Sequence, residues 1–200
     1  MKIKLFLKCL LAAVLLTGTA GGCSEENSVF YSPSYYIMKS EDLLFDSVID
    51  LPANLPTGNS RVATYYAMGV QKYKSQVKAG TNPILYEWVL AGPKAVLFDA
   101  GNKKIGSHGA GPFWELSPAD SIFAQQFNPV KAVTPDGSSI PWLQLMPKNG
   151  RTPTGIFLNV AYIQRIATTG GKAPTVAPVS LSDTVDVKYT AVYRFSKRNQ

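Results

Sequence analysis

Apolar and polar side chains alternate regularly near the end of the chain. One face of an extended segment there would carry the apolar residues Val185, Val187, Tyr189, Ala191, Tyr193 and Phe195. The opposite face would carry mainly polar residues, namely Asp186, Lys188, Thr190, Arg194 and Ser196. A period of two residues is typical of an antiparallel strand that buries one face, and it is too strict for a helix. We therefore predict a strand over 185–196, with the first set buried and the second set facing solvent.

Segments with the composition of strands recur through the chain from residue 61, with glycine or proline between them. They are Tyr65–Lys74, Ile84–Leu90, Lys94–Asp99, Phe113–Trp114, Ile140–Met146 and Gly155–Ile166. We expect Gly92-Pro93 to end the second of these strands. In the last of them the even positions are expected to form one deeply buried face: Ile156, Leu158, Val160 and Tyr162. Ser121–Val133 fits either a strand or two turns of helix.

These elements indicate one all-β domain. Short strands, glycine and proline between them and no long amphipathic helix predict a single-domain antiparallel β-sandwich or small β-barrel over residues 61–200. The preceding residues, 23–60, have the character of a tether and lead-in. Tyr31, Tyr35 and Tyr36 are too aromatic for a freely disordered segment, so we expect this lead-in to dock partly on the domain.

The first residues have the pattern of a bacterial lipoprotein signal. Lysines precede the apolar run Leu10–Leu16, which is too short to span a bilayer, and small residues lead to Cys23. Ala20-Gly21-Gly22-Cys23 resembles a lipobox, in which residues 1–22 are removed and the cysteine is lipidated. The alternative is ordinary cleavage after Ala20, which leaves Cys23 as a plain thiol. The lipoprotein interpretation predicts a membrane anchor at Cys23 in the bacterial cell envelope. Because Ser24, and not an aspartate, follows the cysteine, we expect the anchor at the outer membrane of a Gram-negative host.

Charge and cysteine content exclude several classes of function. Without residues 1–22, 17 basic residues face 13 acidic ones, a net charge of about +4. This excess is no nucleic-acid footprint, and we expect no nucleic-acid partner. Cys9 leaves with the signal and Cys23 is used by the lipid, so we expect no disulfide in the domain. One histidine and no available thiol fall short of a zinc site, and no phosphate-binding glycine loop occurs, so we expect no metal or cofactor.

The stretch Ile105–Glu115 holds the only histidine of the chain, His108, among closely spaced glycines. Glycine at this density indicates backbone that bends sharply or approaches another group closely. A histidine with an ordinary pKa near 6.5 is the natural general base at neutral pH, and Glu115 is a candidate partner across a turn. The alternative is that His108 hydrogen-bonds the backbone of a tight glycine loop.

Aromatic side chains offer a second kind of site. Trp88, Trp114 and Trp142 lie on three different predicted strands. An exposed indole can stack on a sugar or an apolar ligand, whereas the alternative for each is a place in the core. Arg165 is expected near Glu115, as an ion pair. The candidate binding residues are His108, Trp114, Glu115, Trp142 and Arg165.

An ordered series of motifs resembles the secreted family called domain of unknown function 3455. The motifs are Gly69–Tyr73, Gly92–Ala95, Gly106–Glu115, Ile140–Leu143, Tyr162–Arg165, Gly170–Pro174 and Tyr189–Phe195. The resemblance covers roughly Val70 to Phe195 and implies little about function. Members of that family often carry cysteines where this chain has Ser75 and, approximately, Pro178. Losing such a bridge would cost about 2–5 kcal/mol, which we expect the Tyr- and Trp-rich core and the lead-in to offset.

The sequence thus predicts a lipid-anchored protein of the cell envelope without catalytic activity. We expect it to bind a polysaccharide, a peptide or a small ligand around the His108 loop and Trp114. The first alternative is a hydrolase that uses His108 and Glu115, and the second is a structural component of the envelope. The direction in which His108 and Glu115 point discriminates between them.

Overall fold

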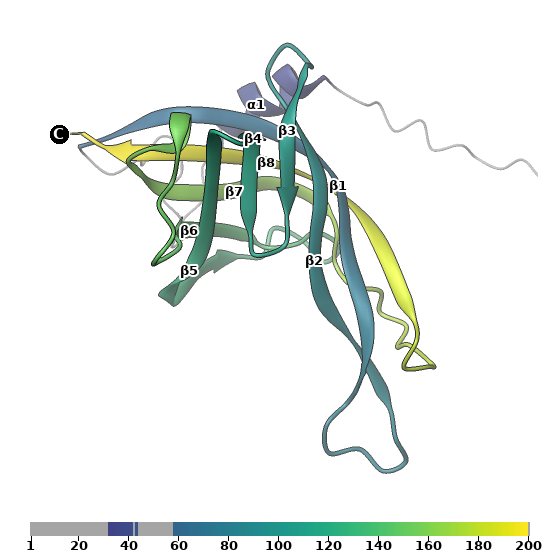
Figure 1. The fold of residues 1–200 in the computed structure, drawn as a ribbon. Coiled ribbons are helices and arrows are strands. Elements are labelled where there is room, and N and C mark those ends of the chain that lie inside the picture. The colour runs from purple at the N-terminus through teal and green to yellow at the C-terminus, as the bar shows by residue number, and fades with distance from the viewer. Residues whose placement is uncertain (1–31, 42, 44–57, 200) are drawn as a thin grey trace, which may run out of the picture. The chain divides into compact units, whose positions relative to one another are not determined.

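A computed structural model describes residues 32–41, 43 and 58–199 of the chain (Figure 1). The predicted signal segment and Cys23 lie outside the described residues. The described elements are the helix α1 (Pro33–Glu41), the strands β1 (Asn59–Val77), β2 (Tyr86–Phe98), β3 (Lys104–Gly109), β4 (Phe113–Ser117), β5 (Asp120–Val133) and β6 (Trp142–Pro147), the short 3-10 helix η2 (Gly155–Phe157), and the strands β7 (Val160–Gly170) and β8 (Thr184–Arg198).

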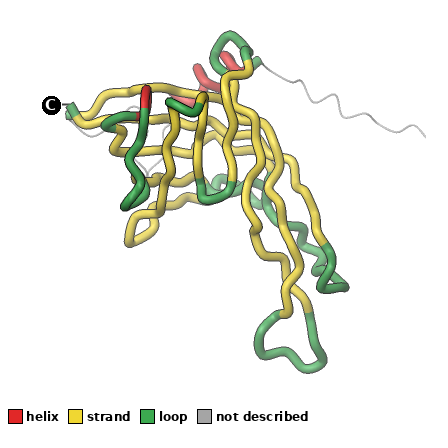
Figure 2. The backbone as a smooth tube through the Cα atoms, in the orientation of Figure 1, coloured by secondary structure: helices red, strands yellow, loops and turns green. Residues whose placement is uncertain are grey.

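The strands form a closed up-and-down barrel (Figure 2). Each strand pairs antiparallel with the next one along the chain, and β8 returns to pair with β1 over a long ladder from Asn59↔Arg198 to Lys74↔Thr184. Closure leaves the barrel without a free edge strand. The all-β antiparallel prediction is confirmed, in its barrel form, and Ser121–Val133 proves to be part of strand β5.

Alternation along each strand fills the barrel with apolar side chains. On β8 the inward positions are Tyr189, Ala191, Tyr193 and Phe195, all buried as predicted. Leu97, Trp114, Ile122 and Ile163 contribute from other strands to the same core. Large aromatic rings and small residues such as Ala67 and Ala191 contribute to the same core, as is usual for the interior of a small barrel.

A second apolar cluster lies on the outer surface of the barrel, where α1 packs. Tyr36 of α1 stacks on Tyr66 of β1, with ring centroids 4.9 Å apart and planes inclined by 13°. Tyr66 is joined there by Trp142, Ile166 and Val192, the outward residues of neighbouring strands. The predicted docking of the lead-in is therefore observed for its helical part. Within the described ranges no helix has the length and apolar character needed to cross a membrane.

The motif Gly92-Pro93 does not end a strand, contrary to the sequence prediction. Strand β2 runs through it, and Pro93 keeps its register opposite Gln71 of β1. The pairing shifts between Lys72 and Tyr73, and Gly92 takes a φ of +138° that few other residues adopt. A bulge therefore absorbs the bend, and the ladder continues past a residue that lacks an N–H.

The strand predicted over Gly155–Ile166 begins only at Val160. Gly155 and Asn159 have φ values of +55° and +66°, and the chain between them forms the 3-10 turn η2. Ile156 and Leu158 are exposed, while Phe157 is buried. A second irregularity between Val160 and Tyr162 then reverses the alternation. Of the expected buried face, Val160 is buried as predicted, Tyr162 is half-buried, and Ile156 and Leu158 are exposed, because two left-handed residues and a bulge change the phase.

The outer face of β8 is also partly covered, which the sequence did not predict. Asp186 and Lys188 are exposed as expected, but Arg194 and Ser196 are buried. Here β8 runs under the helix α1 and beside the outward side chains of β1 and β7. Successive side chains of β8 still point to opposite faces of the sheet, as the alternation predicts. Because α1 packs on the outer face, the outward residues beneath it are buried.

Candidate functional site

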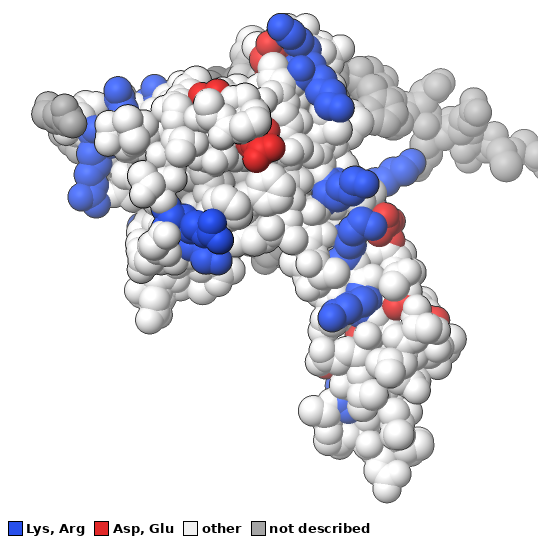
Figure 3. All heavy atoms as spheres, in the orientation of Figure 1, with Lys and Arg blue, Asp and Glu red and all other residues white. Residues whose placement is uncertain are grey.

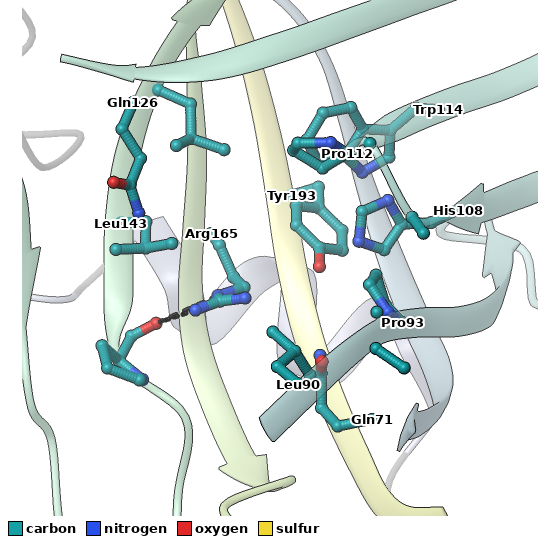
Figure 4. Close-up of a pocket in the computed structure, with 16 residues that line it drawn as sticks. Gln71, Leu90, Pro93, His108, Pro112, Trp114, Gln126, Leu143, Arg165 and Tyr193 are labelled. Carbon is teal, nitrogen blue, oxygen red and sulfur yellow. Dashed lines mark hydrogen bonds between the residues drawn. The ribbon is translucent and has the colours of Figure 1, made fainter. Parts of the chain in front are cut away.

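The barrel interior contains a cavity of about 490 Å³. It opens at the end of the barrel formed by the β3–β4 turn, with Ala110, Gly111 and Pro112 at its rim. Most of the wall is apolar and includes Leu90, Pro93, Trp114, Leu143 and Leu145. Polar groups are supplied by Gln71, His108, Gln126, Arg165 and Tyr193 (Figure 4).

Aromatic residues close the barrel behind this cavity. The indole of Trp114 meets the ring of Phe195 edge-on at 5.6 Å, and Phe157 of η2 packs on Phe195 at 4.8 Å. Asp120 holds η2 in place by accepting the backbone N–H of Ile156 at 2.9 Å. The site is thus a pocket with buried aromatic residues on its inner side and exposed residues such as Leu90 and Ala110 on its outer side.

His108 forms part of the cavity wall and is only 3% exposed. Its imidazole lies flat on the indole of Trp114, its register partner across β3 and β4. Nδ1 lies 2.7 Å from the carbonyl oxygen of Phe113, which can only accept, so Nδ1 carries the proton and donates it. Nε2 of the neutral ring is then an acceptor.

Burial keeps His108 uncharged. Desolvation is the main cause that lowers its pKa from 6.5 to about 4, and the positive charge of Arg165 acts in the same direction. The hydrogen bond to Phe113 acts against this shift. At neutral pH His108 is therefore a neutral hydrogen-bonding group, and the backbone bond foreseen as the alternative for it is present.

The glycines around His108 allow this arrangement. A β-carbon on Gly106 would collide with the backbone carbonyl oxygen of Glu115, so glycine at this position allows the close approach of β3 and β4. Gly111, with a φ of +127°, and Pro112 make the turn that leads from β3 into β4. The bending and close approach expected from the glycine spacing are both observed.

Arg165 supplies the only charge of the cavity wall among the described residues that line it. It lies on the inner face of β7, between Leu143 of β6 and Tyr193 of β8. Its Nε and Nη2 donate to the carbonyl oxygen of Pro141 at 3.0 and 2.8 Å. No acidic side chain in the described part of the chain pairs with it.

Two further polar groups of the wall are almost completely buried. Tyr193 is 1% exposed, and its hydroxyl lies next to Tyr189 and Arg165 without a hydrogen bond of good geometry to a described residue. Burial raises the pKa of Tyr193, and the nearby charge of Arg165 only partly opposes that shift, so the phenol stays protonated. The Nε2 group of Gln71, also 1% exposed, likewise lacks a partner in the described structure.

The structure brings three of the five candidate residues together. His108, Trp114 and Arg165 line one cavity. Glu115 is exposed on the outer face of β4, because it follows the inward Trp114, and it reaches neither His108 nor Arg165. Trp142 is buried in the outer cluster under α1. The expected pairs of Glu115 with His108 and with Arg165 are therefore wrong.

Gln71 and Tyr193 line the cavity although the sequence pattern did not predict them as site residues. Gln71 continues the inward series Tyr65, Ala67 and Gly69 on β1, so a polar residue at a core position was the available signal. Tyr193 was recognised as inward but was assigned to the core. Among the described residues, no group of His, Cys, Asp and Glu side chains is arranged to hold a metal ion.

Comparison with known proteins gives one match. A family model described as "Protein of unknown function (DUF3455)" covers residues 56–197. The chain belongs to the DUF3455 family. No curated protein and no solved structure matches the chain. All the residues that line the cavity fall within the matched range, so the cavity lies wholly within the DUF3455 domain.

Proposed function

We propose that this DUF3455 protein binds a small, largely apolar molecule inside its barrel. The observation that supports the proposal is the cavity of about 490 Å³, whose largely apolar wall carries a few buried polar groups. Cavities of several hundred Å³ with this composition are the usual form of small-molecule sites, and eight-stranded barrels have room for one such ligand.

The shape of the cavity favours a small ligand over the other two classes that the sequence left open. A polysaccharide or a peptide binds along an open groove or a sheet edge, whereas this cavity ends at Trp114 and the aromatic layer behind it. Trp114 is completely buried, and it therefore offers a ligand the inside of the pocket only.

The lining residues favour binding over hydrolysis. No described residue of the wall carries a carboxylate, a thiol or an aliphatic hydroxyl. A nucleophile and its base need to lie within hydrogen-bond reach of one another, and His108 instead has Trp114 on its face and Phe113 at its Nδ1. A neutral imidazole in that position serves recognition.

The proposal keeps the lipid anchor at Cys23 as part of the function. The lysines at the start, the short apolar run Leu10–Leu16 and the lipobox-like Ala20-Gly21-Gly22-Cys23 support it. An anchored barrel would hold its ligand at the envelope. Cys23→Ser is expected to release the protein from membranes, and retention of this variant would contradict the anchor without affecting the cavity.

Binding can be tested with N-phenyl-1-naphthylamine, a neutral probe that becomes fluorescent in apolar surroundings. The full-length protein carrying Cys23→Ser avoids both detergent and attached lipid, which would compete for the cavity. We expect saturable binding with one probe per protein. Ala110→Trp places a bulky ring at the rim and is expected to weaken binding about tenfold or more.

The matched control is Ala119→Trp, the same change in the exposed turn before β5 at the other end of the barrel. It is expected to leave probe affinity unchanged. Absence of saturable binding, or equal effects of the two variants, would overturn the proposed function.

A further inference from the structure

We propose that the ligand of the barrel is an apolar monocarboxylate, held through its carboxylate by Arg165. This inference rests on the proposed function and specifies the chemistry of its ligand. Four observations carry it: the uncompensated charge of Arg165, the buried donors beside that charge, the single charge of the wall, and the apolar remainder of the cavity.

The guanidinium of Arg165 is only partly satisfied. Pro141 accepts from the edge that carries Nε and Nη2. The end of the group, with both N–H groups of Nη1 and the second of Nη2, makes no hydrogen bond of good geometry to a described residue, and the hydroxyl of Tyr193 is its neighbour there. Two parallel N–H groups at that end match the two oxygens of a carboxylate.

The neighbouring buried groups are donors as well. Figure 4 shows the polar ends of Arg165, Tyr193 and Gln71 gathered in the middle of the cavity. The protonated hydroxyl of Tyr193 and Nε2 of Gln71 make no hydrogen bond of good geometry in the described structure, and both atoms are almost completely buried. A buried donor without an acceptor costs about 1–3 kcal/mol, so a carboxylate beside Arg165 adds acceptors to a part of the wall that is rich in donors.

The charge balance of the wall selects a single negative charge. His108 is neutral, and no described lining residue other than Arg165 is charged at pH 7. A carboxylate neutralises that charge, whereas a doubly charged phosphate would bring an unpaired charge into an apolar cavity. Leu90, Leu143 and Leu145 leave an apolar surface for the rest of the molecule.

The surface of the protein favours the approach of such a ligand. Strands β1 and β2 continue beyond the barrel towards the loop that joins them, as the β1–β2 extension (Figure 1). On the face shown in Figure 3, basic side chains are more abundant than acidic ones, over both the barrel and this extension. Without residues 1–22, 17 basic residues face 13 acidic ones, a net charge of about +4. A positive field raises the rate at which anions reach a site, and added salt reduces that rate.

The test compares decanoate with decanol, which share a chain and differ in the headgroup. Each displaces N-phenyl-1-naphthylamine from the full-length protein carrying Cys23→Ser. We expect decanoate to bind about tenfold tighter or more, as a charge-assisted pair of hydrogen bonds implies. Decyl phosphate is expected to bind more weakly than decanoate. Equal affinities for decanoate and decanol, or tighter binding of decyl phosphate, would overturn the carboxylate assignment and leave the proposed function standing.

Substitutions of Arg165 test whether this residue is the cause of the tighter binding of decanoate relative to decanol. Arg165→Gln is expected to remove the advantage of decanoate over decanol while decanol still binds, and Arg165→Lys is expected to retain part of it. Arg198→Gln, an exposed arginine at the end of β8, is the matched control and should change neither affinity. Because the readout is a ratio within one protein, a loss of stability alone does not change it. A decanoate advantage that persists in folded Arg165→Gln would overturn the role of Arg165.

Discussion

The imidazole of His108 lies face to face on the indole of Trp114, with ring centroids 4.5 Å apart and planes inclined by 14°. Tyr193 contacts both rings, at 4.8 Å from His108 and 5.1 Å from Trp114. The three side chains come from different strands and form one wall of the cavity. The same three rings therefore pack against one another in the barrel and line its cavity.

Stability should depend on pH through His108. A histidine in the unfolded chain takes up a proton near pH 6.5, whereas the folded protein resists protonation until about pH 4. Between these values the unfolded state binds more protons, so the free energy of unfolding falls as the pH falls. The loss attributable to His108 is about 3 kcal/mol in total, and it is absent above pH 6.5.

Urea unfolding of the wild type and His108→Gln at pH 7 and pH 4 measures this loss as a difference between the two proteins. Because the chain has a single histidine, NMR of a preparation without a histidine tag shows the same group directly. An imidazole that titrates near pH 6.5 in the folded protein would contradict its burial.

Filling the cavity should not destabilise the barrel. Leu143→Trp adds volume beside open space, and we expect a free energy of unfolding within about 1 kcal/mol of the wild type together with loss of probe binding. Ile163→Trp makes a similar change on β7 in the closely packed core and should cost about 1–3 kcal/mol. Equal losses from the two variants, measured by urea unfolding, would show that the cavity is not open space.

Removal of the Tyr36 ring should weaken the fold and leave the site intact. Tyr36→Ala removes the stack on Tyr66, and we expect a loss of about 1–2 kcal/mol, because the ring is only half-buried. Met38→Ala, on the exposed side of α1, is the control. Unchanged thermal stability of Tyr36→Ala would show that the lead-in does not stabilise the barrel.

Ser75 is a buried polar residue of β1. Its hydroxyl has no hydrogen-bond partner in the described structure. Ser75→Ala should therefore raise the free energy of unfolding by about 1 kcal/mol, because a desolvated hydroxyl is removed. A clear decrease in the melting temperature would indicate a partner for that hydroxyl.

The sequence predicted the fold class because alternation along β8 and its neighbours is a local property. It did not predict that β2 continues through Gly92-Pro93, or that Gly155 and Asn159 delay β7, since both depend on bulges and backbone angles set by the partner strands. Closure into a barrel rather than a sandwich is decided by the pairing of β1 with β8, which are far apart in the sequence.

The site was predicted in part for the same reason. The glycine spacing identified the His108 turn, and strand alternation put His108 and Trp114 on one face. Which strands face each other across the barrel is a tertiary property, so the approach of Arg165 and Tyr193 to His108 was not accessible from the pattern. Glu115 was assigned to the site by its proximity in sequence, although its neighbour Trp114 already occupies the inward position.

The central claim is that a small ligand enters the barrel beside Trp114, and the indole N–H signals of the ¹⁵N-labelled protein test it most directly. Trp88 lies on the β1–β2 extension, where it donates to the carbonyl of Val176 at 2.9 Å, and Trp142 lies in the outer cluster. Trp88→Phe and Trp142→Phe assign the signals. On titration with decanoate we predict a saturable shift of the Trp114 signal while the other two stay fixed. A shift of Trp88 or Trp142 with Trp114 unmoved would contradict the account.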